Sequence, residues 1–595
     1  MNPTPTVHSL PLRQADFSNL TDALDYAAKG DTGFNFFSGS GKLLSVLPYR
    51  SLREEARLLA LRLLGMGFRR AERVAIVAET GPEFMEVFFA CQYAGLVPVP
   101  VPAAIHIGGH NVYVENLRRL LTTCDATGAV APEAYLPLLE EAAGHFRLRF
   151  LGAAQDIGTQ PNGPVQLDPS SGDDLAYLQY TSGSTRFPRG VMVTQAGVMD
   201  NLAMIVGHGM RVNPEDRAVS WLPYYHDMGL VGFVLAPMAA QRSVDYLSPR
   251  SFAMRPRLWL ALMSRNRGTL SFSPPFGYEL CARSLKPPDI AALDLTPWRV
   301  AGLGAEPIRP EPLARFADLL APAGFDSRSF LAGYGMAECT LAVSFSSLGK
   351  GLVIDHVDRD LLAETHQACT CKGHTIREAA ARKTLVDCGE PLPGYEVEIR
   401  NDDGLAVPER TVGALYVRGP SVMKGYFGDT DATAESLSPD GWLKTGDLAY
   451  RIGRRLIITG REKDMMIING RNIWPQDLEV LAEGQPEVRT GDASAFAVEG
   501  CDGSDKAVLV IQCKPADGSA RKDLADRIRS LVLSEQGIPC TVEIVPRHTL
   551  PRTTSGKLSR SRARKDYLQR QVCKATMKDE KQGQGIRHLR QAANG

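Results

Sequence analysis

Along the first hundred residues, segments with apolar side chains at helical spacing alternate with short, continuous apolar runs. Residues 49–66 and 83–95 carry apolar side chains at helical spacing. Residues 73–78 and 96–102 are short Val- and Ala-rich runs of strand length. Helices that alternate with short buried strands predict a layered α/β fold, in which the apolar positions of these segments form the core.

The pattern changes in the second half of the chain. Short alternating runs at 397–400, 413–417 and 456–458 predict strands of a small β-rich unit. Beyond them, helical patterns at 475–484 and 520–536 combine with strand-like runs to predict a further small α/β domain.

These changes divide the chain into predicted domains. At 595 residues the chain is too long for one ordinary domain. We expect a large N-terminal domain of residues 1–461, with an insertion at about 346–384 and a β-rich subdomain at about 385–461. A small C-terminal domain of residues 462–570 follows. The last residues, 571–595, are polar and poor in apolar side chains, which predicts a disordered tail.

Composition excludes some classes of partner. Lys plus Arg and Asp plus Glu both number 67, so the net charge is zero and favours neither nucleic acid nor membrane binding. No apolar run reaches the roughly 18 residues of a membrane span, so we expect no stable membrane insertion. The N-terminal residues lack the pattern of a signal peptide, and the 11 cysteines are scattered. Both features indicate a cytoplasmic protein.

Residues 180–190, Tyr-Thr-Ser-Gly-Ser-Thr-Arg-Phe-Pro-Arg-Gly, are the strongest candidate for a binding loop. They follow a strand-like run at 175–180, and Arg189 adds a fixed positive charge. Backbone N–H groups in such a turn converge on an anion, and short hydroxyls add donors. The hydroxyls and the glycine between them are Thr181, Ser182, Gly183, Ser184 and Thr185. The alternative is an ordinary surface turn.

Two other patterns suggest sites but fit them poorly. Ser-Gly-Ser-Gly-Lys at 38–42 resembles a Walker loop, yet Phe36 occupies the position of its first glycine, so a hairpin turn is expected. His106 with His110, and Cys369 with its neighbours Cys371 and His374, lack enough ligands at metal spacing.

Four single residues are candidates for chemistry, each with an ordinary alternative. His226 and Asp227 lie between aromatic residues and an apolar run. They could form a gate that handles a carboxylate, or His226 could be a core histidine next to Asp227 as a helix N-cap. Glu338 follows Ala-Gly-Tyr-Gly-Met-Ala and could hold a divalent cation or begin a helix. Asp447 could accept ribose hydroxyls or stabilise a turn. Lys557 could reach a cleft or remain solvated.

These segments, in this order, resemble the adenylate-forming superfamily of acyl-CoA synthetases, luciferases and nonribosomal adenylation domains, over residues 49–567. Within it, Tyr-His-Asp-Met-Gly-Leu at 225–230 and Gly-Ala-Glu-Pro at 304–307 are similar to the fatty acyl-AMP ligases. Lys-Asp-Met-Met-Ile-Ile-Asn-Gly-Arg-Asn at 463–472 resembles their hinge. The insertion before residue 385 lies where that family has an extra segment, which is thought to restrain the small domain and disfavour transfer to free coenzyme A.

The resemblance implies a role for each candidate. Thr181, Ser182, Gly183, Ser184, Thr185 and Arg189 would bind ATP phosphates beside a Mg²⁺ ion on Glu338. The nucleoside would contact Gly304, Ala305, Glu306, Tyr334, Gly335, Met336, Asp447 and Arg461. The acyl group would contact His226, Asp227, Met228, Gly229 and Phe276. Lys557, with His226 and Glu338, would be catalytic, and Lys463 would be the hinge.

The implied reaction is activation of a long- or medium-chain fatty acid by ATP, followed by transfer to an acyl carrier protein. That carrier would serve a polyketide or nonribosomal loading module. The alternative is a fatty acyl-CoA synthetase, and Asp227 leaves amino-acid activation open. A non-catalytic nucleotide sensor would be expected to lack Glu338 or Lys557. The sequence departs from the family at Arg189, where a lysine is usual, and this exchange is not neutral because arginine binds anions as a planar fork.

Overall fold

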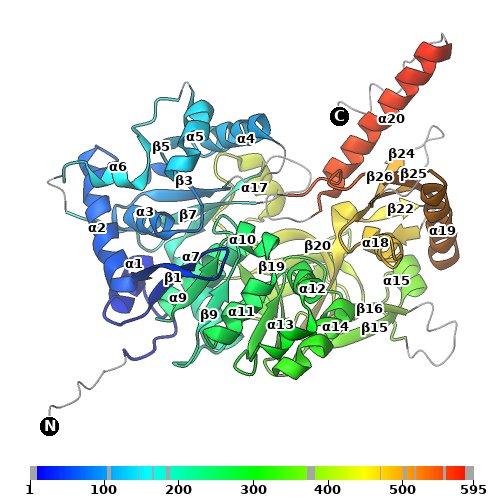
Figure 1. Cartoon of the computed structure of the whole chain (residues 1–595), viewed down its shortest axis with the longest axis horizontal. Coiled ribbons are helices and arrows are strands. Elements are labelled where there is room, and N and C mark those ends of the chain that lie inside the picture. The colour runs from blue at the N-terminus through cyan, green and yellow to red at the C-terminus, as the bar shows by residue number, and fades with distance from the viewer. Residues whose placement is uncertain are drawn as a thin grey trace.

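The protein was analysed as a computed structural model (Figure 1). The structure describes residues 10–103, 109–144, 146–163, 166–181, 188–371, 382–468, 471–499, 505–514, 518–553 and 558–582; side chains of the final helix are described up to residue 572. Helices and strands alternate through most of the chain, and the predicted α/β class is confirmed.

A nine-stranded sheet is the centre of the described large domain, in the order β17-β14-β13-β12-β11-β9-β10-β1-β2. Neighbours from β13 to β1 run parallel, whereas β2, β14 and β17 are antiparallel additions at the two ends. The strands are β1 (Gly33–Phe37), β2 (Leu43–Pro48), β9 (Ala218–Ser220), β10 (Val244–Leu247), β11 (Leu270–Ser273), β12 (Val300–Leu303), β13 (Phe330–Gly335), β14 (Ala342–Phe345) and β17 (Glu390–Pro391).

Apolar faces of the surrounding helices complete this core. Helix α2 buries Leu52, Ala56, Leu59 and Leu63, which recur at helical spacing. The helices are α1 (Leu20–Ala27), α2 (Tyr49–Gly65), α3 (Pro82–Tyr93), α7 (Gln195–Met204), α8 (Asp227–Leu230), α9 (Ala236–Ala239), α10 (Pro249–Met254), α11 (Arg257–Arg265), α12 (Pro275–Ser284), α13 (Pro287–Ala291) and α14 (Pro310–Leu320). The π-helical segments η2 (Ile205–Gly209) and η3 (Val231–Leu235) extend α7 and α8.

A second, parallel sheet has the order β4-β3-β5-β6. Pro98 and Pro100 lie in β4, which fits its position at the end of this sheet because proline cannot donate to a neighbouring strand. The elements are β3 (Arg73–Val77), β4 (Val97–Val101), α4 (His110–Thr123), β5 (Ala126–Val130), η1 (Glu133–Tyr135), α5 (Leu136–Ala143), β6 (Phe150–Gly152) and α6 (Ala154–Gly158). The hairpin β7 (Leu175–Tyr180) and β8 (Gly190–Thr194) flanks the predicted phosphate loop.

An antiparallel sheet, β18-β19-β20-β21, corresponds to the β-rich unit expected from the sequence. Its elements are β18 (Glu396–Arg400), β19 (Gly413–Arg418), α17 (Thr430–Ser436), β20 (Leu443–Ile452) and β21 (Arg455–Arg461). The segment predicted as an insertion contains β15 (Ile354–Asp358) and α15 (Arg359–Thr365), and β15 pairs with β16 (Arg382–Val386).

Many apolar residues between Met466 and Ile538 form a hydrophobic core of their own. It contains β22 (Met466–Ile468), β23 (Arg471–Ile473), α18 (Pro475–Glu483), β24 (Ala493–Glu499), β25 (Asp505–Gln512), α19 (Gly518–Gln536) and β26 (Cys540–Val545). The predicted boundary at 461/462 stays a prediction, and η7 (Glu462–Asp464) lies at it.

The final helix departs from the sequence prediction. Helix α20 (Arg560–Gln582) continues past residue 570, where a disordered tail was expected, and Figure 1 shows it extending away from the body. Residues 571–582 contain helix-favouring Gln, Lys, Ala, Met and Glu, so the low apolar content was a poor guide to their backbone. Residues 583–595 lie outside the described part.

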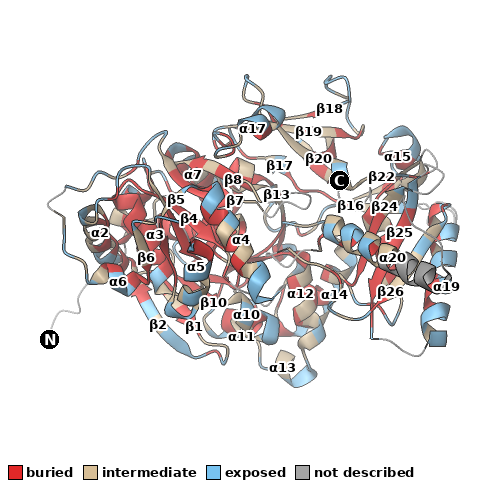
Figure 2. Ribbon diagram, turned by 90° about the horizontal axis from the view of Figure 1, so that it is seen from above, coloured by how far each residue is buried: buried red, intermediate tan, exposed pale blue. Residues whose placement is uncertain are grey.

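The hairpin expected at 38–42 joins β1 to β2 and is confirmed. The strands and helices expected at 49–66, 73–78, 83–95 and 96–102 are confirmed as α2, β3, α3 and β4. Figure 2 shows that buried residues follow the strands of the sheets, with exposed residues mainly on helix surfaces and loops. Among the described helices, none has the length and apolar content needed to cross a membrane.

Candidate active site

Carboxyl ends of neighbouring parallel strands bring the candidate segments to one edge of the large sheet. The segment after β9 contains His226, the segment after β11 contains Phe276, and Gly304 follows β12 directly. Tyr334 lies at the end of β13. In open α/β sheets this edge is where ligands bind, so the topology gathers residues that are far apart in the sequence.

Tyr334, Asp447 and Arg461 form one group. The Tyr334 hydroxyl donates to Asp447 Oδ2 at 2.7 Å, and Arg461 Nε lies 3.3 Å from Asp447 Oδ1. Asp447 and Arg461 are opposite each other on β20 and β21, which fixes their pairing. Asp447 is buried, and its charge raises the pKa of Arg461. Three of the eight residues predicted around the nucleoside are therefore joined through Asp447.

Glu338 and Arg189 are connected through a residue that the sequence analysis missed, Tyr426. The Tyr426 hydroxyl donates to Glu338 Oε1 at 2.8 Å, and the Arg189 guanidinium lies 5.2 Å from the centre of the Tyr426 ring. Asp429 also holds Arg189, with Nε to Oδ2 at 3.3 Å. A backbone bridge between Val191 and Tyr426 places the tyrosine beside the phosphate-loop hairpin. No local pattern at Tyr426 indicated these contacts.

The charge state of Glu338 depends on its neighbours. Burial raises its pKa above the ordinary 4.5, while hydrogen bonds from the backbone and Tyr426 and the charge of Arg461 act in the opposite direction. The charge of Asp227 raises this pKa further, so the His226–Asp227 segment lies within electrostatic reach of Glu338. A nearby cation would favour the ionised carboxylate.

These surroundings fit a Mg²⁺ ion that would be bound by one protein carboxylate together with oxygens of the substrate phosphates. Mg²⁺ in nucleotide sites is usually bound by one or two carboxylates plus phosphate oxygens, so Glu338 alone is sufficient from the protein. The described residues contain no cluster of three His, Cys, Asp or Glu side chains that could bind a metal unaided.

A buried polar network fixes the turn that carries Glu338. Asn201 Nδ2 donates to the Ala342 carbonyl at 2.8 Å and to Ser421 Oγ at 3.0 Å. Ser421 Oγ also donates to the Cys339 carbonyl, directly after Glu338. Asn201 and Ser421 are almost inaccessible, and such satisfied buried networks hold the backbone in one arrangement. Neither residue was a sequence candidate.

Only the two flanks of the predicted phosphate loop are described. The Thr181 amide donates to the Arg189 carbonyl at 3.0 Å, so these residues close the base of the loop. Ser182, Gly183, Ser184 and Thr185 lie outside the described residues. The strand before the loop contacts the acyl motif, because Gln179 Nε2 donates to the Tyr225 carbonyl at 2.7 Å.

His226 and Asp227 begin α8 together. His226 Nδ1 and Asp227 Oδ1 are 2.6 Å apart, and the Met228 amide donates to Asp227 Oδ1 at 2.6 Å. His226 is the N-cap residue and Asp227 the first residue of the helix, so the alternative that placed the cap at Asp227 is off by one position. Gly229 is required by packing, since a Cβ there would lie 2.1 Å from the Pro223 carbonyl oxygen.

Glu306 fixes the position of Phe276. The Phe276 amide donates to Glu306 Oε1 at 2.9 Å, at the start of α12, and the Phe276 ring meets Trp221 edge-on at 5.8 Å between centroids. Ala305 has φ of +69°, an uncommon conformation for alanine that fixes the course of this loop. Gly304 lies close to β13, because a Cβ there would lie 3.3 Å from the Gly333 carbonyl oxygen.

Met336 and Gly335 shape the turn after β13. The Met336 amide donates to the Leu341 carbonyl at 2.8 Å. A Cβ at Gly335 would lie 1.8 Å from that same carbonyl oxygen, so the turn requires glycine. Both residues therefore have a structural role beside any contact with a ligand.

Of the predicted hinge and catalytic lysines, the structure describes Lys463 but not Lys557. Lys463 is exposed in η7, between the β-rich sheet and the small-domain core. Lys557 lies outside the described residues. Just after it, Arg560 joins Asp464 at 2.7 Å and Glu479 at 2.8 Å, which attaches the start of α20 to η7 and α18.

The predicted insertion contacts the small domain through polar side chains. Lys383 Nζ lies 2.8 Å from Asp477 Oδ2, and burial lowers the pKa of Lys383. Arg471 pairs with Asp360 at 3.1 Å. Asn472 donates to the Ala363 carbonyl at 3.1 Å. These contacts join β16 and α15 to β23 and α18.

Comparison with known proteins gives several long matches. The family model for AMP-binding enzymes matches residues 44–427. A putative acyl-CoA synthetase of Caulobacter vibrioides is 42% identical over 95% of this chain and 98% of its own length. The medium-chain-fatty-acid–[acyl-carrier-protein] ligase JamA of Moorena producens is 31% identical over 94% and 96%. A solved structure from studies of fatty acyl-adenylate ligases of E. coli and L. pneumophila is 45% identical, with a TM-score of 0.90 over 95% of this chain and 100% of that one.

Proposed function

The chain belongs to the AMP-binding enzyme family as an adenylate-forming ligase that activates fatty acids, and we propose that it transfers the acyl group to an acyl carrier protein. The resemblance to fatty acyl-AMP ligases is confirmed. The observation that carries the adenylation step is the continuous contact from Arg189 through Tyr426 to Glu338, because it unites phosphate-binding and metal-binding candidates.

The proposed first step joins the fatty acid to AMP. A carboxylate oxygen of the fatty acid attacks the α-phosphorus of ATP, a C–O–P bond forms, and the bond to pyrophosphate breaks. Both reactants are anions, so the protein must position them and neutralise charge. The product is a mixed anhydride, whose leaving group is good enough for attack by a thiol.

Arg189 is proposed to face the β- and γ-phosphates with the loop residues Thr181, Ser182, Gly183, Ser184 and Thr185. Tyr426 and Asp429 hold Arg189 in place, which preserves a fixed cation where the family usually has lysine. Glu338 would hold Mg²⁺, which when bound would supply charge neutralisation between phosphates. Lys557 is proposed to neutralise charge between the carboxylate and the α-phosphorus.

The nucleoside is proposed to lie between the ends of β12 and β13. Asp447 would accept the ribose hydroxyls with its orientation fixed by Tyr334 and Arg461. The backbone around Gly304, Ala305, Glu306, Gly335 and Met336 would hold the adenine, with the Tyr334 ring beside it. The small residues among them, Gly304, Ala305 and Gly335, allow a planar base to approach the backbone closely.

The acyl group is proposed to enter beside His226. His226 and Asp227 would position the carboxylate end, while Met228, Gly229 and Phe276 would contact the chain. Trp221 and Phe252 stack at 3.8 Å behind this segment and give it an apolar, buried support. Medium or long acyl chains are the proposed substrates.

A phosphopantetheine thiol on a carrier protein of a polyketide or nonribosomal loading module is the proposed acceptor. Contacts between the insertion and the small domain support this choice, because they would oppose the rotation about Lys463 that admits free coenzyme A. The name of the Caulobacter vibrioides relative favours a second candidate, acyl-CoA synthesis.

Thioester formation distinguishes the two acceptors. The protein is incubated with ATP, Mg²⁺, a fatty acid and either coenzyme A or a phosphopantetheinylated carrier protein, and products are measured by mass spectrometry. We expect acyl-AMP in both reactions and thioester mainly on the carrier protein. Efficient acyl-CoA formation would overturn the carrier-protein proposal, and absence of acyl-AMP with every fatty acid would overturn the first step.

A further inference from the structure

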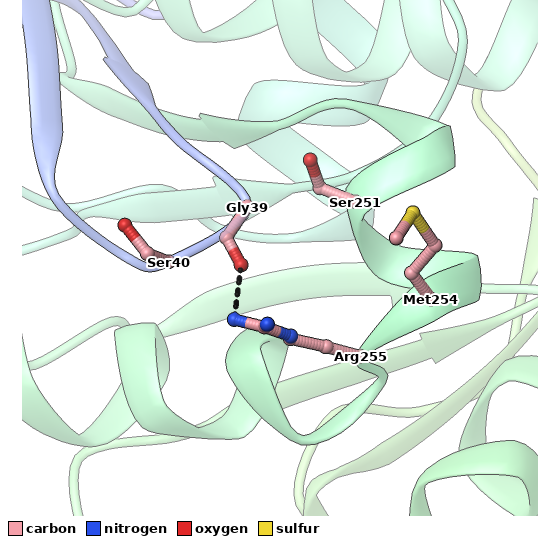
Figure 3. A pocket seen from close by; sticks show the side chains of 5 residues that line it. All are labelled: Gly39, Ser40, Ser251, Met254 and Arg255. Atoms are coloured by element: carbon pink, nitrogen blue, oxygen red, sulfur yellow. Dashed lines mark hydrogen bonds between the residues drawn. The ribbon is translucent and has the colours of Figure 1, made fainter.

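The β1–β2 hairpin and α10 enclose a solvent-open hollow of about 310 Å³ (Figure 3). It is lined by Gly39, Ser40, Ser251, Met254 and Arg255. Arg255 Nη1 donates to the Gly39 carbonyl at 3.2 Å, which attaches the helix to the tip of the hairpin. The hollow is separate from the residues assigned above to the nucleotide.

Large apolar side chains are exposed on the two elements that border this hollow, and one of them, Met254, lines it. Leu43, Leu44 and Val46 on β2 are 54%, 69% and 52% exposed, and Met254 on α10 is 70% exposed. β2 is the end strand of the nine-stranded sheet, and Figure 2 shows its surface as exposed. Exposed apolar residues that occur singly need no explanation, whereas a group of them marks a contact surface.

The two chain segments that form this surface carry charge of one sign. Segments 38–53 and 248–267 contain no Asp or Glu, although the whole chain has zero net charge. Lys42, Arg250 and Arg255 are exposed, and none forms an ion pair with another described residue. Arg257 is excluded from this group because it pairs with Asp289 at 3.3 Å. Leu43, Leu44, Val46 and Met254 with Lys42, Arg250 and Arg255 are called the hairpin–α10 surface.

The hairpin–α10 surface lies on the acyl side of the active site. β1, β10 and β9 are consecutive parallel strands, so the hollow after β1 and β10 and the His226 segment after β9 share one edge of the sheet. Phe252 of α10 stacks at 3.8 Å on Trp221, which lies four residues before the motif at 225–230 that is proposed to contact the acyl group. The helix that borders the hollow therefore also supports the acyl motif.

We propose that the hairpin–α10 surface binds an anionic lipid surface, from which the fatty acid reaches the acyl site. The substrate part of this inference rests on the proposed function, but the binding itself does not. Aliphatic side chains beside unpaired cations match the boundary between acyl chains and anionic headgroups. An acidic protein would match the cations but would leave the exposed aliphatic residues of β2 without an apolar partner.

Co-sedimentation of the full-length protein with vesicles tests the binding. The vesicles contain phosphatidylcholine with or without phosphatidylglycerol, at low and high salt. We expect binding to the anionic vesicles that decreases with salt. Each cation near an anionic membrane contributes about fivefold, so Arg250→Gln with Arg255→Gln should weaken binding on the order of 20-fold. Leu44→Ser with Met254→Ser should weaken it at least about tenfold.

Leu405→Ser and Leu533→Ser are matched controls, because these residues are 65% and 55% exposed on other parts of the protein. We expect both controls to bind like the wild type, and all variants to adenylate a water-soluble short-chain fatty acid at the wild-type rate. Failure of the wild type to bind anionic vesicles would overturn the proposal. Binding of the surface variants to anionic vesicles as strongly as the wild type would also overturn it. The exposed strand β2 could instead pair with a second copy of the chain, so a changed oligomeric state of the variants with unchanged lipid binding would overturn the proposal as well.

Discussion

The Tyr426 hydroxyl donates to Glu338 Oε1 at 2.8 Å while the face of the same ring lies beneath the Arg189 guanidinium. One side chain thus orients both the proposed metal ligand and the proposed phosphate-binding cation. These three residues come from different segments, and the strand bridge at Val191 brings them together. Tyr426 is a positioning residue, since it acts through Glu338 and Arg189.

Replacement of Tyr426 by Phe should separate its two contacts. The ring beneath Arg189 is kept, but the hydrogen bond that lowers the pKa of Glu338 is lost. The pKa of Glu338 then rises further above 4.5, so its ionised form requires a higher pH. We expect the acidic limb of the pH–rate profile for pyrophosphate release to move to higher pH.

Tyr93→Phe is the control for this variant, because Tyr93 donates to Asp25 away from the candidate site. Its pH–rate profile should match the wild type. An unchanged acidic limb in Tyr426→Phe would show that Glu338 does not titrate in the measured step, and would remove the role given to this hydrogen bond.

Tyr334→Phe tests the proposed ribose contact. The variant keeps an aromatic ring but loses the 2.7 Å hydrogen bond to Asp447, leaving that carboxylate less fixed. We expect the KM for ATP to rise about tenfold with a small change in kcat. Tyr450→Phe removes a similar bond, from Tyr450 to Asp355 at 2.6 Å, outside the predicted nucleotide site. Equal kinetic effects in the two variants would contradict a nucleotide-specific role for Tyr334.

Lys383→Met tests whether the insertion restrains the small domain. Loss of the ion pair leaves Asp477 without this partner, and breaking a buried pair costs about 3–5 kcal/mol. We expect the rate of acyl-CoA formation to increase at least about tenfold, with acyl-AMP formation unchanged. Arg418→Met breaks the exposed pair with Glu396 and serves as the control. Unchanged coenzyme A activity in Lys383→Met would show that this contact does not select the acceptor.

Glu483 gives the stability of the protein a defined dependence on pH. Burial raises its pKa from 4.5 to about 7, and the ion pair with Arg309 at 2.7 Å opposes this only in part. Between these two pH values the folded protein keeps a proton that the unfolded chain releases, so this group contributes less stability as the pH rises toward 7. The full interval corresponds to about 3 kcal/mol.

Glu483→Gln should remove this dependence, because the amide does not titrate. The melting temperature of the wild type, relative to the variant, is expected to fall as the pH is raised from 4.5 to about 7. Glu487→Gln is a contrasting control, since Arg527 lowers the pKa of Glu487 and moves its titration to the acid side of this interval. Parallel pH curves for wild type and Glu483→Gln would contradict a raised pKa at Glu483.

Much of the fold could be predicted because its signals are local. The helical spacing in α2 and the apolar runs of β3 and β4 identified these elements directly. The contacts within the candidate site join distant residues: Tyr426 and Glu338 are 88 positions apart, and Tyr334 and Asp447 are 113 apart. A single sequence contains no signal for such pairs, so Tyr426, Asn201 and Ser421 could not be recognised from it. For residues 571–582 the expectation of disorder was wrong for the opposite reason, because polar composition says little about helix propensity.

The amount of acyl-AMP formed by the wild type and by Glu338→Gln tests the central claim most directly. Both proteins are incubated with ATP, Mg²⁺ and a fatty acid without an acceptor, and acyl-AMP is measured by mass spectrometry. Because Gln keeps the size of the side chain but loses its charge, we expect acyl-AMP formation to fall on the order of 10²–10³-fold with the melting temperature little changed. Wild-type rates in the folded variant would contradict an adenylate-forming site centred on Glu338.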